Sequence, residues 1–262
     1  MTKKNETRSE IRDQILFIIC FVIAWYVVYK MRVFSPTAFP SVGEIGKSFL
    51  DAFTVNDMLS YTGHSLLLIA KGLAIGIGLA FIFSSLAVIS KHFHAIYNLI
   101  VSICDLLPGV ALLPLAICWF GIGEITVIFI VVHSIIWPMS RSIMDGFRSI
   151  PRMYIESGMN IGLRGLKLVT GVYLPAAFSS VLSGMRVGWA RAWRGLISVE
   201  MIFGTTSSGA GIGWYIMMRR NFMDMSGVFA ALIVIIIIGI LVEYGIFRTV
   251  ENHTVRKWGM IQ

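Results

Sequence analysis

Three cationic side chains stand inside long apolar stretches of this sequence. Lys71, Arg191 and Arg194 each interrupt a run of mostly hydrophobic residues. An ionisable group at membrane depth costs on the order of 2.5 to 3.5 kcal/mol on insertion scales, so it needs a partner, a cavity or an interface. Arg191 and Arg194 are three residues apart and therefore share one helix face. Together with Trp193, which could stack against a solute, these residues predict a positively charged path suited to an anion.

Two other interpretations of the ionisable residues remain open. Arg194 could pair with Glu200 or with another span, which would make the charge structural. Alternatively, Lys71, Asp105 and His133 could form a relay in an ion-coupled secondary transporter, which would need no ATP. An intramembrane enzyme is disfavoured, because the sequence shows no convergent nucleophile, base or metal set, and no catalytic residue is assigned.

No nucleotide, metal or cofactor site is indicated. The nearest approach to a phosphate-binding loop is residues 41–48, SVGEIGKS, where serine replaces the first glycine of that motif. Cys20, Cys104 and Cys118 lie singly within apolar segments, so neither a disulfide framework nor a metal cluster is expected. We therefore expect no directly bound cofactor, and any ATP that drives the protein would be hydrolysed by a separate subunit.

The elements that must carry these residues are membrane helices. The 262 residues are 56% hydrophobic and 14% charged, with a mean hydropathy of +0.79, which exceeds what a soluble domain needs. About 20 helical residues cross a hydrocarbon core of ~30 Å. The sequence predicts an all-α protein, with a cytoplasmic segment at 1–13 and one transmembrane domain at 14–262. The expected spans are 15–31, 64–89, 96–118, 125–144, 178–200 and 227–247.

The distribution of charge predicts which side of the membrane each loop faces. A net charge of +8 could suggest nucleic acid, but the basic residues gather in alternate loops, which indicates topology instead. With both termini in the cytoplasm, the cytoplasmic segments hold Lys3, Lys4, Arg8, Arg12, Lys91, Arg141, Arg148, Arg152, Arg164, Lys167, Arg248, Arg256 and Lys257. The external segments hold Lys30, Arg32, Lys47, Arg219 and Arg220. A cleaved signal peptide is the rival interpretation of the first span, but no clear cleavage site follows it.

Small residues and prolines indicate where the spans approach one another or break. Gly72, Gly76 and Gly78 in the second span predict close helix packing. Pro108 and Pro114 in the third span each predict a kink or an interruption. Backbone carbonyls freed by such a break are tolerated only toward protein or toward a water-filled path.

The loop after the fourth span is longer and more regular than a connector requires. Residues 141–173 are strongly basic and still show helical spacing of apolar side chains. Pro151 suits the first turn of a helix, and Ser149 is a possible cap. This pattern favours a docking surface for a partner, and the alternative is a helix that rests on anionic lipid headgroups.

Within this loop lies a recognisable motif. Residues 156–162 read Glu-Ser-Gly-Met-Asn-Ile-Gly, and after nine further residues 172–175 read Val-Tyr-Leu-Pro. This resembles the signature loop of ABC importer permeases, which reads Glu-Ala-Ala, three residues, Gly, nine residues, then Ile-x-Leu-Pro. The positions that match in identity and spacing are Glu156, Gly162, Leu174 and Pro175. Ser157 and Gly158 replace the two alanines, and Val172 replaces the isoleucine.

The resemblance extends over nearly the whole chain and implies a type I importer permease. Within that family the sequence is most similar to the nitrate, sulfonate and taurine import group, because WFGIGE follows a proline-rich third span. The implied solute is a sulfonate, taurine or nitrate, or alternatively a pyrimidine precursor. The implied assembly is a homodimer in the cell (inner) membrane, with two cytoplasmic ATP-binding subunits and an external or periplasmic substrate-binding protein. Membrane lipid is the other expected partner, and nucleic acid is not.

The resemblance also gives the motif a physical role. Small residues at Ser157 and Gly158 would let a short helix press closely into a cleft of the ATPase, and Gly162 would permit a sharp exit from that helix. Arg152 and Glu156 could pair with charges across the interface. Closure of the ATPase subunits would then move the helix as a lever and rock the spans between inward-open and outward-open states.

Overall fold

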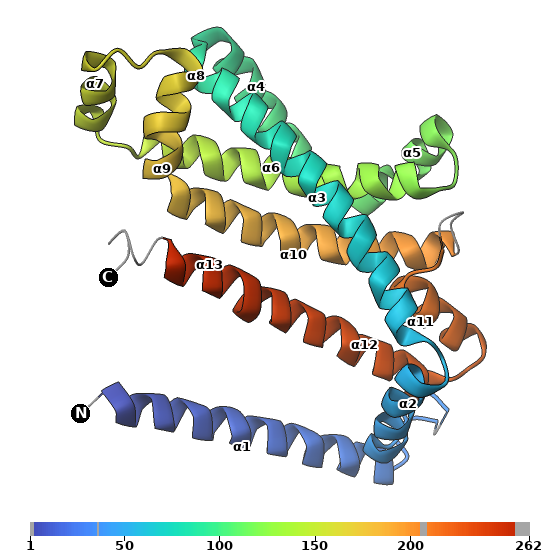
Figure 1. The fold of residues 1–262 in the computed structure, drawn as a ribbon. Helices are drawn as coiled ribbons and strands as arrows, with labels where there is room; N and C mark the ends of the chain where they lie inside the picture. Colours follow the sequence, from blue (N-terminus) through green and yellow to red (C-terminus); the bar gives the residue numbers. More distant parts are fainter. Residues whose placement is uncertain (1–2, 36, 205–208, 255–262) are drawn as a thin grey trace. The chain divides into compact units, whose positions relative to one another are not determined.

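The computed structural model is helical, as the sequence predicts. It describes residues 3–35, 37–204 and 209–254, with side chains from Arg12 onward, and these residues form no β-strand (Figure 1). Arg256 and Lys257, which are predicted to be cytoplasmic, lie outside the described residues, and the side chains of Lys3, Lys4 and Arg8 are not described.

The helices follow one another along the chain with short connections (Figure 1). They are α1 (Lys3–Lys30), α2 (Val42–Thr54), α3 (Met58–Ile89), α4 (Lys91–Cys104), the 3-10 helix η1 (Gly109–Leu112), α5 (Leu113–Phe120), α6 (Glu124–Arg148), α7 (Arg152–Asn160), α8 (Gly165–Leu168), the π-helix η2 (Val169–Tyr173), α9 (Leu174–Ala176), α10 (Phe178–Phe203), α11 (Ile212–Asn221), α12 (Met225–Ile240), the π-helix η3 (Leu241–Phe247) and α13 (Arg248–His253).

Several of these helices are long and apolar enough to cross a membrane. Within the described residues four qualify singly, namely Arg12–Lys30, Met58–Ile89, Glu124–Arg148 and Met225–His253. Two further spans result if each bent pair counts as one, with bends of 92° between Lys91–Cys104 and Gly109–Phe120 and of 78° between Gly165–Ala176 and Phe178–Phe203. The predicted class, an all-α membrane protein with about six spans, is therefore confirmed.

The chain divides into two compact units. The first unit comprises Met1–Leu59 and Tyr215–Val234, and the second comprises Ser60–Trp214 and Ile235–Gln262. In the first unit, the Trp25 ring stacks on Phe39 at 4.1 Å between centroids and meets Phe229 edge-on at 5.1 Å. The Trp25 indole N–H donates to the carbonyl of Pro40 at 3.0 Å, so this aromatic group satisfies its polar atom while it packs.

In the second unit, α6 and α10 pack closely, because small residues line their contact. A Cβ placed on Gly184 of α10 would lie 2.7 Å from Cβ of Ser142 in α6, and one on Gly195 would lie 3.2 Å from the Ser134 hydroxyl. Real Cβ atoms do not approach to 2.7 Å, so Gly184 has no room for a larger side chain. In lipid, close backbone approach of this kind takes the place of a hydrophobic driving force between helices.

Helix α3 also packs on α6 through glycines. A Cβ on Gly72 would lie 2.7 Å from Cβ of Val131, and Gly76 lies against Ile135. The predicted packing role is confirmed for these two glycines. It is wrong for Gly78, where a Cβ would have open space around it.

The predicted third span is broken rather than continuous. Helix α4 ends at Cys104, and η1 begins at Gly109 after Pro108 in an extended conformation, with φ −63° and ψ 125°. Pro108 thus marks a break, as predicted. Pro114 lies in the first turn of α5, where a missing N–H removes no helical hydrogen bond, so it interrupts nothing.

Candidate functional site

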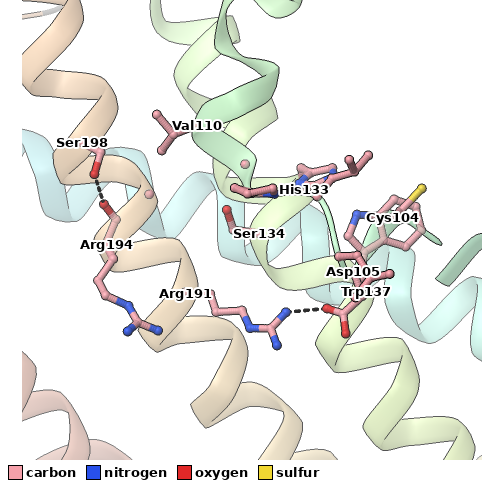
Figure 2. A pocket seen from close by; sticks show the side chains of 14 residues that line it. Cys104, Asp105, Val110, His133, Ser134, Trp137, Arg191, Arg194 and Ser198 are labelled. Carbon is pink, nitrogen blue, oxygen red and sulfur yellow. Dashed lines mark hydrogen bonds and ion pairs between the residues drawn. The ribbon is translucent and has the colours of Figure 1, made fainter. Parts of the chain in front are cut away.

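A cavity of about 330 Å³ lies where the break after α4 meets α6 and α10 (Figure 2). Its polar lining residues are Asp105, His133, Ser134, Trp137, Arg191, Arg194 and Ser198, and we call it the polar cavity. Its volume falls at the lower end of the range of about 300 to 1,000 Å³ that is typical of small-molecule sites. The break, rather than a regular helix, places Asp105 at this point.

Asp105 is held between two arginines from two different helices. Arg191 of α10 donates to the Asp105 carboxylate through Nη1 (Figure 2), and Nη2 of Arg141 in α6 lies 3.4 Å from the other carboxylate oxygen. The Asp105 side chain is 13% exposed, whereas both arginine side chains are more exposed. One carboxylate therefore partly neutralises two cations.

Arg194 brings a further positive charge to the same cavity. Within the described residues no carboxylate lies at ion-pair distance from its guanidinium group. Its Nε donates at 3.0 Å to the carbonyl of Ala190 on its own helix, which leaves the terminal nitrogens free of a carboxylate partner. The sequence alternative in which Arg194 pairs with Glu200 is wrong, because Glu200 accepts hydrogen bonds from Ser65 and Gly213 instead.

His133 and Trp137 complete the wall opposite the arginines (Figure 2). Their rings meet edge-on, with 5.8 Å between centroids, and His133 is only 9% exposed. Neither ring nitrogen of His133 nor the indole nitrogen of Trp137 has a hydrogen-bond partner in the described part of the chain. Trp137 is not among the residues predicted from the sequence, although its position four residues after His133 on a helix places the two side chains on one face.

Two residues predicted for the solute path lie elsewhere. Lys71 of α3 forms an ion pair with Glu124 at the start of α6 and does not line the polar cavity. Trp193 is buried at 5% exposure and stacks on Trp189, so it packs inside the protein. Lys71 pairs with Glu124 and lies apart from Asp105 and His133. The structure therefore does not bring together the three residues of the alternative relay.

The loop at 150–175, which we call the signature loop, forms a helix with a tight exit. Helix α7 ends in a Schellman motif: the N–H of Gly162 donates to the Met159 carbonyl at 3.0 Å, and that of Leu163 donates to the Gly158 carbonyl at 3.0 Å. Gly162 has φ +88°, a left-handed conformation that favours glycine. This left-handed conformation explains why the motif has a glycine at this position.

One face of α7 is open to a partner. Arg152, Glu156 and Ser157 are exposed, and within the described residues neither charged group has an ion pair. Two apolar side chains beside them are also exposed, Met153 at 65% and Tyr154 at 55%. Exposed apolar and charged groups together are typical of an interaction surface.

The other motif residues position the loop. Gly158 is buried, and a Cβ there would lie 2.7 Å from Cγ2 of Val172, so the glycine lets α7 lie close to the second half of the loop. Leu174 packs on the core of the second unit, and Pro175 lies in the first turn of α9. The sequence suggested Ser149 as a cap for α7, but Ser149 instead ends α6. Its hydroxyl donates to the Gly146 carbonyl at 2.8 Å.

Residues 72–255 match the protein family described as "Binding-protein-dependent transport system inner membrane component". This match covers both the polar cavity and the signature loop. The chain belongs to this family. It is thus a membrane permease of the ABC importer class, with the type I importer fold that the signature loop implies.

Relatives of this permease carry names of the same kind. A provisionally named ABC transporter permease protein of Methanocaldococcus jannaschii is 33% identical over 60% of either chain. A provisionally named aliphatic sulfonates transport permease protein of Bacillus subtilis is 26% identical over 90% of this chain and 84% of its own length. The taurine transport system permease protein of Escherichia coli is 26% identical over 91% of this chain and 86% of its own. The permease thus spans less than two thirds of the first relative and most of the other two.

Proposed function

We propose that this permease forms the solute path of an ATP-driven importer for a small anion, of the sulfonate, taurine or nitrate kind. The observation that carries the proposal is the cationic excess of the polar cavity, where Arg191 and Arg194 lie with Asp105, the one acidic lining residue in the described part of the chain. A cavity with an excess of one charge sign attracts solutes of the opposite sign and raises their local concentration. The names of relatives, which include sulfonates and taurine, are in keeping with such a solute.

The same proposal assigns the partners. One ATP-binding subunit docks on the exposed face of α7 in each of the two permease copies. Arg152, Glu156 and Ser157 supply charged and small contacts there, and Gly162, Leu174 and Pro175 hold the helix in place. The permease works as a homodimer, receives solute from an external or periplasmic binding protein, and binds no cofactor of its own. Both termini lie on the cytoplasmic side of the cell (inner) membrane, together with the basic signature loop.

Uptake by cells that lack the native copy and carry a plasmid copy tests this proposal. Arg194→Gln, which removes the charge, should reduce uptake of labelled taurine and nitrate about tenfold, whereas Arg194→Lys should retain part of it. Lys47→Gln on α2 is the matched control, because it removes a cation from another part of the chain. Depletion of ATP should abolish uptake in every variant.

Three results would contradict the proposal in different ways. Uptake that survives ATP depletion but is lost with an ionophore would support the ion-coupled transporter. Uptake of a neutral pyrimidine precursor without any uptake of anions would change the solute class. Unchanged anion uptake by Arg194→Gln would move the path away from the polar cavity.

A further inference from the structure

Among the described residues, Asp105 is the one acidic side chain that lines the polar cavity, and it already pairs with Arg191 of the cavity lining and with Arg141 beside the cavity. Asp105 lies on the segment between α4 and η1, with its carboxylate between Arg191 of α10 and Arg141 of α6. Figure 2 shows the Arg191 guanidinium group directed at this carboxylate. A solute anion that enters the cavity therefore meets an arginine that is already paired.

Two buried aromatic side chains of the cavity have ring nitrogens without a hydrogen-bond partner among the described residues. His133 is more than nine-tenths buried, and both of its ring nitrogens lack a hydrogen-bond partner among the described residues. The buried indole N–H of Trp137, beside it, also lacks an acceptor. Most buried polar groups in proteins are paired, so unpaired donors that line a cavity indicate an acceptor that arrives from outside.

We propose that Asp105 is an internal competitor of the transported solute. In the empty cavity its carboxylate holds Arg191, and it releases Arg191 to the oxygen atoms of a singly charged oxyanion headgroup such as a sulfonate. The oxygens of this headgroup accept hydrogen bonds from Arg191, Arg194 and the unpaired N–H groups of His133 and Trp137. This inference rests on the proposed function, because it concerns the same anion path.

The second arginine makes the exchange feasible. Arg141 lies 3.4 Å from the Asp105 carboxylate and remains beside it when Arg191 turns to the solute. The displaced carboxylate is then still paired, which avoids the large penalty of an uncompensated charge in a low-dielectric site. Competition also keeps the solute from binding too tightly, and a transport path must release what it binds.

A binding titration of the purified full-length permease tests the proposal. The probe is potassium methanesulfonate, exchanged for chloride at constant ionic strength, and the readout is the apparent Kd from the shift in thermal unfolding midpoint. Asp105→Asn should tighten binding about fivefold, because the partly exposed ion pair between Asp105 and Arg191 no longer competes with methanesulfonate for Arg191. Asp105→Ser, which is also uncharged but smaller, should shift the Kd in the same direction and guards against a folding defect in the first variant.

Control variants separate this inference from the proposed function. Glu243→Gln removes a carboxylate that pairs with Arg186, away from the polar cavity, and should leave the Kd unchanged. If both Asp105 variants bind as weakly as the parent or more weakly, while Arg194→Gln weakens binding, the anion path stands and the competitor role is wrong. If neither Arg191→Gln nor Arg194→Gln alters binding, the anion path itself fails and the competitor role fails with it.

Discussion

The carboxylate of Glu200, buried in α10, accepts a hydrogen bond of 2.7 Å from the hydroxyl of Ser65 in α3. It also accepts one of 2.9 Å from the backbone N–H of Gly213 at the start of α11, and the Ser65 hydroxyl in turn accepts one of 2.9 Å from Ile212 N–H. An acidic side chain near a helix N-terminus is favourable, because the first N–H groups there have no partner within the helix. These bonds join α3, α10 and the start of α11 within the second unit.

Glu200→Ala should therefore destabilise the protein through the groups it leaves unpaired. The N–H of Gly213 and the hydroxyl of Ser65 would lose their acceptor inside the protein, at about 1 to 3 kcal/mol for each buried group left unsatisfied. Glu200→Gln keeps one carbonyl oxygen and should cost less. Thermal unfolding in detergent, with hydrogen exchange of the Ile212 and Gly213 amides, measures both effects. Equal stability of the Ala and Gln variants would contradict this account.

The glycines of α3 provide a matched pair of substitutions. Gly72→Ala forces a methyl group against Val131 of α6 and should destabilise by about 1 to 3 kcal/mol, the usual cost of overpacking. Gly78→Ala places the same methyl group in open space and should be neutral or slightly stabilising, because alanine favours the helix. Comparison of the two unfolding midpoints tests the α3–α6 contact directly. A larger loss at Gly78 than at Gly72 would show that the helix faces are assigned incorrectly.

The exit from α7 depends on the backbone conformation of Gly162. Gly162→Ala should destabilise the Schellman motif by roughly 1 to 2 kcal/mol, since a Cβ is unfavourable in the left-handed region. Gly162→Asn should cost less, because asparagine tolerates this region better than alanine does. Protease cleavage in the signature loop is a suitable measurement, with Gly46→Ala on α2 as a control that has open space around it. Faster cleavage in the control than in Gly162→Ala would contradict the prediction.

Asp224, just before α12, should make stability depend on pH. Partial burial alone would raise its pKa, but hydrogen bonds from the backbone N–H of Gly227 and the Ser226 hydroxyl, together with Arg219, lower the pKa below its usual value. Its contribution to stability is therefore full above the ordinary Asp pKa and is lost as the pH falls through the lowered value. Unfolding midpoints from about pH 7 to about pH 3 should fall less steeply in Asp224→Asn than in the parent. An identical pH profile would refute this.

Part of this architecture follows from the sequence because hydropathy and motif spacing are local properties. The apolar runs predict the membrane helices, and the spacing from Glu156 to Pro175 predicts the signature loop. Helix periodicity alone also shows which residues of one helix lie on different faces. Gly72 and Gly76 lie four residues apart on one face, whereas Gly78 lies about 200° further round, and Trp193 lies about 200° from Arg191. Helix periodicity alone thus places Gly78 and Trp193 on faces different from those of Gly76 and Arg191.

Other features depend on contacts between distant segments and have no local signal. Lys71 forms an ion pair with Glu124, and Arg191 forms one with Asp105, which is 86 residues away in sequence. Such pairs are set by which helices pack together and in which register. Pro108 indicates that the third span breaks, but nothing in the sequence gives the 92° bend that brings Asp105 beside α10.

The most direct test of the central claim is recovery of an ATPase with the tagged full-length permease from its native membrane. The parent should retain an ATP-hydrolysing subunit. Ser157→Arg, which places a large side chain on the exposed face of α7, and Glu156→Ala should lose it, whereas Lys47→Ala on α2 should not. A parent that carries no ATPase, or docking-face variants that keep it fully, would contradict the account of this chain as an ATP-driven permease coupled through α7.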